Sequence, residues 1–231
     1  MNEYYRKRQA KYLKKLDKQY SYVRNDLEAL FGVPYADLLE EAKRIFVGDL
    51  LEDMPYIGAN DKHEIDLVDS CYWVALFIAG ENHNIPREKT AEVMFGVFEK
   101  MYGEIPQFLI KMIRGMAGKR GFQRILKMYA ASHKKNAAKY RYAWDYEYEP
   151  PDAEYSHKMT CVRCGFAMYM EEKKLTEFMP YICRLDYLIF GKMGLSLYRS
   201  KTIGCGNGVC TMYFKLNEAI PSVGFDDDHL K

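Results

Sequence analysis

The hydrophobic periodicity of the chain changes near residue 140, and this change constrains the fold more than any other feature. Before it, apolar residues recur at three- and four-residue spacing, as on one face of an α-helix. After it, aromatic residues occupy every second position from Tyr140 to Tyr148. Such a two-residue repeat is typical of a β-strand with one covered face. The sequence therefore predicts an α+β fold, with a helical N-terminal half packed with a small antiparallel sheet of about four strands and a covering helix.

The expected elements are separated by glycine, proline or asparagine. The sequence contains no linker rich in Gly, Ser or Pro, so we expect a helical region, 1–138, and a sheet region, 139–231, in one continuous domain. Helices are expected at 4–31, 35–51, 64–80, 87–102, 106–117, 121–137 and 180–192. Strands are expected at 140–148, 155–161, 195–204 and 208–216, with Asn207-Gly208 in the turn between the last two.

The composition is that of an ordinary globular protein. Of the 231 residues, 48% are apolar and 29% are charged. The longest apolar run, Tyr72 to Ala79, is too short to span a bilayer, and the N-terminus has no signal-like apolar segment. We therefore expect a cytoplasmic protein with no membrane partner, in which cysteines are thiols, metal ligands or buried small residues rather than disulfides.

Positive charge is concentrated in two segments. Eight Lys or Arg stand against two acids from Met1 to Arg24, and ten stand against none from Gln107 to Trp144. Basic residues at helical spacing usually form a solvated face, so we do not expect nucleic acid as a partner. The second segment could supply positive potential to an anionic substrate.

Five of the six cysteines lie between Cys161 and Leu216. Cys161-Val-Arg-Cys164-Gly has the spacing of a zinc knuckle, in which two thiolates bind the metal. The chain lacks a second Cys-x-x-Cys pair, since Cys205 and Cys210 are separated by four residues. Zinc is therefore left open as a cofactor, and no metal-ligand set is assigned.

Cys183 and Asp186 are three residues apart on an expected helix, so both project from one face. This spacing could place a thiol beside a carboxylate at the rim of an apolar pocket. Alternatively, Cys183 packs as a small apolar residue and Asp186 accepts a hydrogen bond from Tyr187 or Arg199. A Cys–His nucleophilic pair would require His157 nearby. On the last strand, the alternation turns Cys210 toward the covered side of the sheet.

These residues form a pattern that resembles the L-2-amino-thiazoline-4-carboxylic acid hydrolase family. The pattern comprises Cys183-x-x-Asp186, Arg199-Ser-Lys-Thr-Ile-Gly204 and Gly206-Asn-Gly-Val-Cys210-Thr-Met-Tyr-Phe. The resemblance carries over Cys183, Asp186 and Cys210 as catalytic candidates. We assign Asp186 as acid or base, Cys183 or Cys210 as thiolate nucleophile or metal ligand, and Arg199 as a carboxylate clamp, with His157 as a further substrate contact.

The resemblance implies a hydrolase that acts on a carbon–nitrogen or carbon–sulfur bond of a small cyclic amidine or amide acid. Water or an enzyme nucleophile would add to the ring carbon between sulfur and nitrogen, and the ring thiolate would leave. The expected partner is thus a small molecule with a carboxylate, and a homo-oligomer is left open. The alternative is a non-catalytic sensor module that binds a small molecule or zinc, because the glycine turn with an inward cysteine is also similar to four-vinyl-reductase domains.

Overall fold

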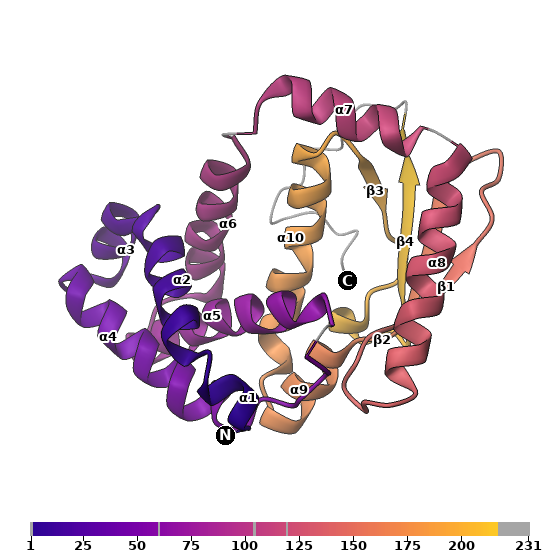
Figure 1. Cartoon of the computed structure of the whole chain (residues 1–231). Helices are drawn as coiled ribbons and strands as arrows, with labels where there is room; N and C mark the ends of the chain where they lie inside the picture. Colours follow the sequence, from indigo (N-terminus) through magenta and orange to yellow (C-terminus); the bar gives the residue numbers. More distant parts are fainter. Residues whose placement is uncertain (1, 60, 104, 119, 217–231) are drawn as a thin grey trace. The chain divides into compact units, whose positions relative to one another are not determined.

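The computed structural model describes residues 2–59, 61–103, 105–118 and 120–216. The chain divides into two compact units, Met1–Met101 and Tyr102–Lys231 (Figure 1). The boundary lies inside the helical region expected from the sequence, before the sheet begins. That residues 1–231 form one continuous domain stays a prediction, and each unit is described by itself below.

The first unit is built from helices around α5, His63–Asn82. Helix α5 is apolar on nearly all sides, as expected for a helix that is surrounded by others. Its Tyr72 hydroxyl donates to the Tyr12 carbonyl (2.9 Å), while the Tyr20 hydroxyl donates to the Tyr72 carbonyl (2.6 Å), so these buried hydroxyls are paired. The other elements are α1 Glu3–Arg6, α2 Gln9–Ser21, α3 Arg24–Phe31, α4 Tyr35–Ile45, the π-helical turn η1 Phe46–Leu51 and α6 Arg87–Gly103.

The single helix expected over 4–31 is wrong, because the chain forms three helical segments there. The helix is interrupted by a turn at Lys7 and Arg8 and again at Tyr22 and Val23, where Val23 has φ −125° and ψ 27°. Neither break has a glycine or proline to mark it in the sequence. Leu16 of α2 and Leu27 of α3, on either side of the second break, are both fully buried.

The second unit combines a four-stranded antiparallel sheet with helices, which confirms the predicted α+β fold. The strands are arranged in the order β1-β2-β4-β3. The bounds are α7 Gln107–Ala117, α8 Arg120–Ala137, β1 Asp145–Glu149, β2 His157–Arg163, α9 Gly165–Lys173, the 3₁₀ turn η2 Thr176–Phe178, α10 Met179–Lys192, β3 Ser196–Tyr198, the 3₁₀ turn η3 Ile203–Cys205 and β4 Cys210–Lys215.

Helices α8 and α10 cover the same face of this sheet (Figure 1). Tyr146 of β1 meets Tyr129 of α8 with ring centroids 5.6 Å apart, and Phe214 of β4 meets Phe190 of α10 at 4.9 Å. On β2, the alternate residues His157, Met159 and Cys161 point to this covered face, as the predicted alternation requires. The opposite face is polar and carries Glu149, Lys158, Thr160 and Tyr213.

The strand expected over 140–148 begins only at Asp145, so the prediction is wrong for its first half. Carbonyl groups within and before this segment bind Arg163 instead. The Arg163 guanidinium donates to the carbonyls of Ala137 (2.5 Å) and Ala143 (3.1 Å), which holds a turn in place. Tyr140, Tyr142 and Tyr146 therefore do not share one strand face.

Two further differences concern the segment around the cysteines. Helix α9 was not among the expected elements, although its buried Phe166, Tyr169 and Met170 follow helical spacing. The strand expected over 195–204 is limited to β3, and the left-handed backbone falls at Gly206 (φ 88°) instead of Asn207-Gly208. Asn207 instead accepts a hydrogen bond from the Thr202 backbone N–H (2.9 Å) through its side chain.

Among the helices of the described residues, none combines the length and apolar character that crossing a bilayer requires.

Gly165 provides a test of the junction between β2 and α9. A Cβ at this position would lie 1.8 Å from the Tyr142 carbonyl oxygen, a backbone atom that cannot move aside as a flexible side chain can. We expect Gly165→Ala to lower the free energy of unfolding by about 3 kcal/mol, measured by urea denaturation. Gly115→Ala in α7, where a Cβ meets nothing within 4 Å, is the matched control and should be neutral or stabilising by up to about 1 kcal/mol. Equal effects of the two substitutions would contradict the close approach.

Candidate functional site

The candidate site lies at one end of the sheet, where β2 ends and β4 begins. Cys161 and Cys210 are directly opposite each other on these antiparallel strands, and both are buried. Cys164 follows β2 by one residue and caps α9, while Cys183 comes from α10. The four thiols interact electrostatically, since Cys210 contributes to raising the pKa of Cys161, Cys164 and Cys183. Cys205 also contributes to raising the pKa of Cys210, so the fold gathers all five clustered cysteines in this region.

An ion pair between Arg199 and Asp186 stands beside these thiols. Arg199 Nη2 lies 2.5 Å from Asp186 Oδ2, and Nη1 donates to the Cys183 carbonyl at 3.2 Å. The Arg199 side chain is 2% exposed, whereas that of Asp186 is 41% exposed. Burial is the largest single effect and lowers the pKa of Arg199, but the charge and hydrogen bond of Asp186, together with Cys183 and Cys210, raise this pKa overall, so the guanidinium stays charged. Asp186 thus accepts a hydrogen bond from Arg199, which was one of the two donors expected in the alternative where Cys183 packs as a small apolar residue.

The thiols of the site are held in the neutral form. Burial raises the pKa of Cys161, Cys183, Cys205 and Cys210, and it raises the pKa of Cys164 to about 12. The positive charge of Arg199 opposes this effect at Cys183 and Cys210. A thiolate at neutral pH would therefore require a base or a bound cation in addition to the groups present.

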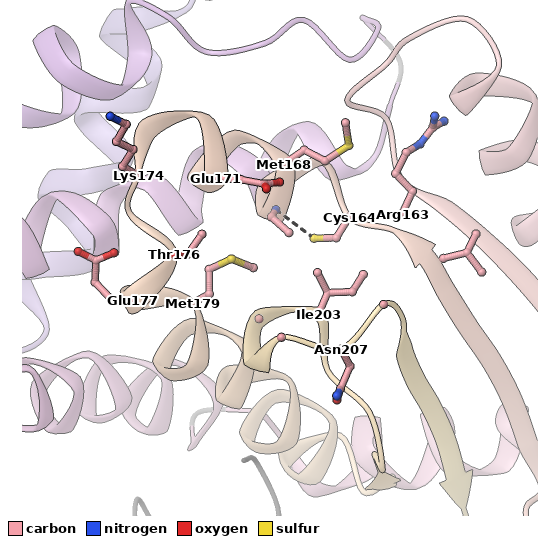
Figure 2. A pocket seen from close by; sticks show the side chains of 15 residues that line it. Arg163, Cys164, Met168, Glu171, Lys174, Thr176, Glu177, Met179, Ile203 and Asn207 are labelled. Carbon is pink, nitrogen blue, oxygen red and sulfur yellow. Dashed lines mark hydrogen bonds between the residues drawn. The ribbon is translucent and has the colours of Figure 1, made fainter.

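A pocket of about 810 Å³ opens beside the thiols, between α9, the start of α10 and residues 203–208 (Figure 2). Of the clustered cysteines, all of which the structure describes, Cys164 lines this pocket and the other four do not. Gly204 separates the pocket from Cys183, because a Cβ on Gly204 would lie 2.7 Å from the Cys183 sulfur. Cys183 is therefore adjacent to Gly204, which lines the pocket, but does not line the pocket itself.

His157 lies elsewhere on the sheet. It is four residues from Cys161 on β2, which corresponds to about 13 Å along the strand. Its Nδ1 lies 2.5 Å from Gln123 Nε2, and its ring contacts Phe122, both on α8. Burial lowers the pKa of His157, which favours the neutral ring. Whereas Cys183, Asp186, Arg199 and Cys210 are brought together, His157 contacts a different helix.

The structure also tests the zinc-knuckle spacing of Cys161 and Cys164. Cys161 Sγ donates to the Arg163 carbonyl (3.2 Å), and Cys164 Sγ accepts from the Ala167 N–H (3.4 Å). Within the described ranges, no group of three or more His, Cys, Asp or Glu side chains is arranged to hold a metal ion.

Comparison with known protein families finds a match. The model of the L-2-amino-thiazoline-4-carboxylic acid hydrolase family matches residues 69–214, more than half of the chain. The chain belongs to this family. A search of curated proteins and a search of solved structures find no match. The matched range contains Cys183, Asp186, Arg199 and Cys210, so the gathered side chains all lie within the hydrolase-family region.

Sequence reasoning did not single out two residues of this family region that the structure places at the pocket. Cys164 appeared only as half of a metal-binding spacing, because cysteine is not a preferred helix N-cap and α9 was not expected. Gly204 appeared only as part of a turn. The apolar residues after Gly165 have helical spacing, and this pattern could have predicted α9. A helix that begins there would have placed Cys164 at its N-terminus.

The Arg199–Asp186 pair should contribute to stability. Asp186→Asn leaves the buried guanidinium without its counter-ion, so we expect the free energy of unfolding to fall by about 1 to 3 kcal/mol. The partial exposure of Asp186 keeps this below the loss for a fully buried pair. In urea denaturation, Glu3→Gln, which breaks an exposed pair with Lys7, should change stability by less than about 0.5 kcal/mol. The ion pair would be unimportant if both variants behaved alike.

Stability should also depend on the buried thiols at alkaline pH. Above about pH 9 the unfolded chain releases thiol protons that the folded chain retains, so the free energy of unfolding falls as the pH rises toward the folded pKa. For Cys164, whose pKa is raised to about 12, the loss is about 1.4 kcal/mol per pH unit. Cys164→Ser should therefore show a shallower decline than the wild type between pH 9 and 10. Parallel declines would show that this thiol does not titrate as described.

Proposed function

We propose that this protein is a hydrolase that opens a small cyclic amidine or amide carboxylic acid by water attack. Membership of the hydrolase family supports the reaction class. The observation that carries the proposal is the pair formed by buried Arg199 and partly exposed Asp186 next to Cys183, since it combines a fixed positive charge, a carboxylate and a thiol in one place. Each is a group that such a reaction needs.

Asp186 is assigned to proton transfer. Arg199 holds Oδ2, while the 41% exposure of the side chain leaves part of the carboxylate accessible to water or ligand. A carboxylate in this position can accept a proton from the attacking water and return it to the amidine nitrogen. The amidine carbon becomes tetrahedral, and the carbon–sulfur bond to the ring thiolate then breaks, which leaves a carbamoyl group and a free thiol.

Arg199 is assigned to charge stabilisation. Its Nη atoms are engaged by Asp186 and by the Cys183 carbonyl, while its buried Nε has no hydrogen-bond partner among the described residues. A buried donor without a partner costs free energy, which a ligand carboxylate or a water molecule can recover. These contacts support two roles for Arg199, which are to hold Asp186 in place and to bind an anionic group of the substrate. Cys183 and Cys210 are the thiols assigned as nucleophile candidates, and His157 as a substrate contact remains a prediction.

Ring opening of L-2-amino-thiazoline-4-carboxylate and related cyclic amidine acids tests this proposal, since each turnover releases a thiol that a chromogenic disulfide reagent detects. We expect Asp186→Asn to lower kcat by at least about 100-fold, as for loss of a general acid–base group. Circular dichroism would establish that the variant is folded under the assay conditions. Glu154→Gln, a change at an exposed carboxylate outside the site, should keep wild-type activity.

Two results would contradict the proposal. Wild-type turnover that survives Asp186→Asn unchanged would remove Asp186 from the mechanism. If the wild type bound such acids without opening any of them, with or without added zinc, the hydrolase proposal would fail in favour of a sensor module that binds small molecules.

A further inference from the structure

The pocket beside α9 has two chemically different ends. Its inner part presents Cys164 between the apolar side chains of Met168 and Ile203, with Met179 close by (Figure 2). Lys174 and Glu177 lie at its other end, and Glu171 lies between them and Cys164 (Figure 2). The pocket thus combines a sulfur-rich apolar end with carboxylate and ammonium groups.

We propose that this pocket is the substrate site and that Cys164, rather than Cys183 or Cys210, is the nucleophile that meets the substrate there. The inference rests on the proposed hydrolase reaction but replaces its assignments of nucleophile, proton acceptor and carboxylate contact, because Asp186 and Arg199 do not line this pocket. It assigns a role to a cysteine outside the family pattern, and it changes how the ring is opened, because a covalent intermediate precedes the attack of water.

The geometry separates Cys164 from the other thiols. Cys210 Sγ accepts the Ile203 N–H (3.1 Å), and Cys183 lies behind Gly204. Cys161 Sγ donates to the Arg163 carbonyl. Cys164 alone among these four lines the pocket, and Figure 2 shows its sulfur directed to the N-terminal turn of α9.

Helix α9 provides the means to stabilise a Cys164 thiolate. The Ala167 N–H donates to the sulfur, and the backbone N–H groups of Ala167 and Phe166 both lower the pKa of Cys164 against the larger effect of burial. Together with the dipole of this nine-residue helix, they favour negative charge on the sulfur. In the free protein Cys164 is a neutral thiol. Its thiolate can form only when another group accepts the thiol proton.

A cyclic amidine is itself that acceptor. The Cys164 proton moves to an amidine nitrogen, and the sulfur bonds to the carbon between the ring nitrogen and ring sulfur. The bond from this carbon to the ring sulfur then breaks, and the ring thiolate takes up the proton. Water adds to the resulting isothiourea carbon, the bond to Cys164 breaks, and the thiol is regenerated as the carbamoyl product leaves. Overall, one substrate and one water give one carbamoyl product, and Cys164 is unchanged.

The charges of the pocket indicate the substrate class. A cyclic amidine acid carries amidine N–H donors and a carboxylate on one small ring. Glu171 and Glu177 can accept hydrogen bonds from the former, and Lys174 can attract the latter, while Met168, Met179 and Ile203 suit a ring with a sulfur or methylene edge. A small ring that combines a neutral amidine, a carboxylate and an apolar or sulfur-containing edge therefore fits better than a ligand without polar groups.

Cys164→Ser, compared with Cys205→Ser, tests the assignment. Serine is a preferred helix N-cap, so the first variant should keep α9 and the fold. With L-2-amino-thiazoline-4-carboxylate, we expect Cys164→Ser to lose at least about 100-fold in kcat, and Cys205→Ser, a half-buried cysteine that does not line the pocket, to stay within about twofold. Acid-quenched wild type should show an adduct equal to the full mass of the substrate, located on Cys164.

The outcomes distinguish this inference from the proposed function. If the wild type opens the ring and Cys164→Ser does so equally well without an adduct, the nucleophile is wrong and the hydrolase stands. If the wild type opens no ring, the hydrolase fails, and alkylation of the folded protein by iodoacetamide at pH 9 then tests the pocket thiol by itself. Modification of Cys164 before Cys161, Cys183 and Cys210 would support its presentation to the pocket, and the reverse order would overturn it.

Discussion

Burial of the Arg199 guanidinium is the constraint on which the arrangement of the site depends. A charge that is almost fully removed from water must be paired, and here Asp186 of α10 pairs it. The same guanidinium donates to the Cys183 carbonyl, so one side chain ties the segment after β3 to two positions of α10. Because α10 also packs on the sheet through Phe190, this pairing sets where Cys183 stands relative to the pocket.

The thiols of the site show a second consequence of burial. A group of cysteines at the end of a sheet could be a set of nucleophiles or metal ligands, but burial raises their pKa values and holds them neutral. The backbone N–H groups of α9 lower the pKa of Cys164, and the charge of Arg199 lowers that of Cys183. In the free protein the effect of burial is larger, so both pKa values stay raised. Such a balance suits a site that becomes reactive only when a ligand that accepts a proton enters, and it protects the thiols otherwise.

Much of the fold could be predicted because it follows local periodicity. The helices near 64–80, 87–102 and 180–192 are found within a few residues of their expected bounds, and the alternation on β2 was correct. The errors lie where distant contacts replaced local preference. Residues 140–143 have the spacing of a strand, yet Arg163 from β2 uses the carbonyls of Ala137 and Ala143 and makes a turn. The breaks at Arg8 and Val23 likewise have no local signal.

The sequence by itself determined that Cys183 and Asp186 share one helix face and that Cys210 points to the covered side of the sheet, because the repeat of a helix or strand sets the direction of each side chain. Only the tertiary structure decided that Arg199 pairs with Asp186, that His157 packs against α8, and that Cys164 lines the pocket. These relations join elements that are far apart in sequence. They depend on strand register and helix packing, which periodicity does not specify.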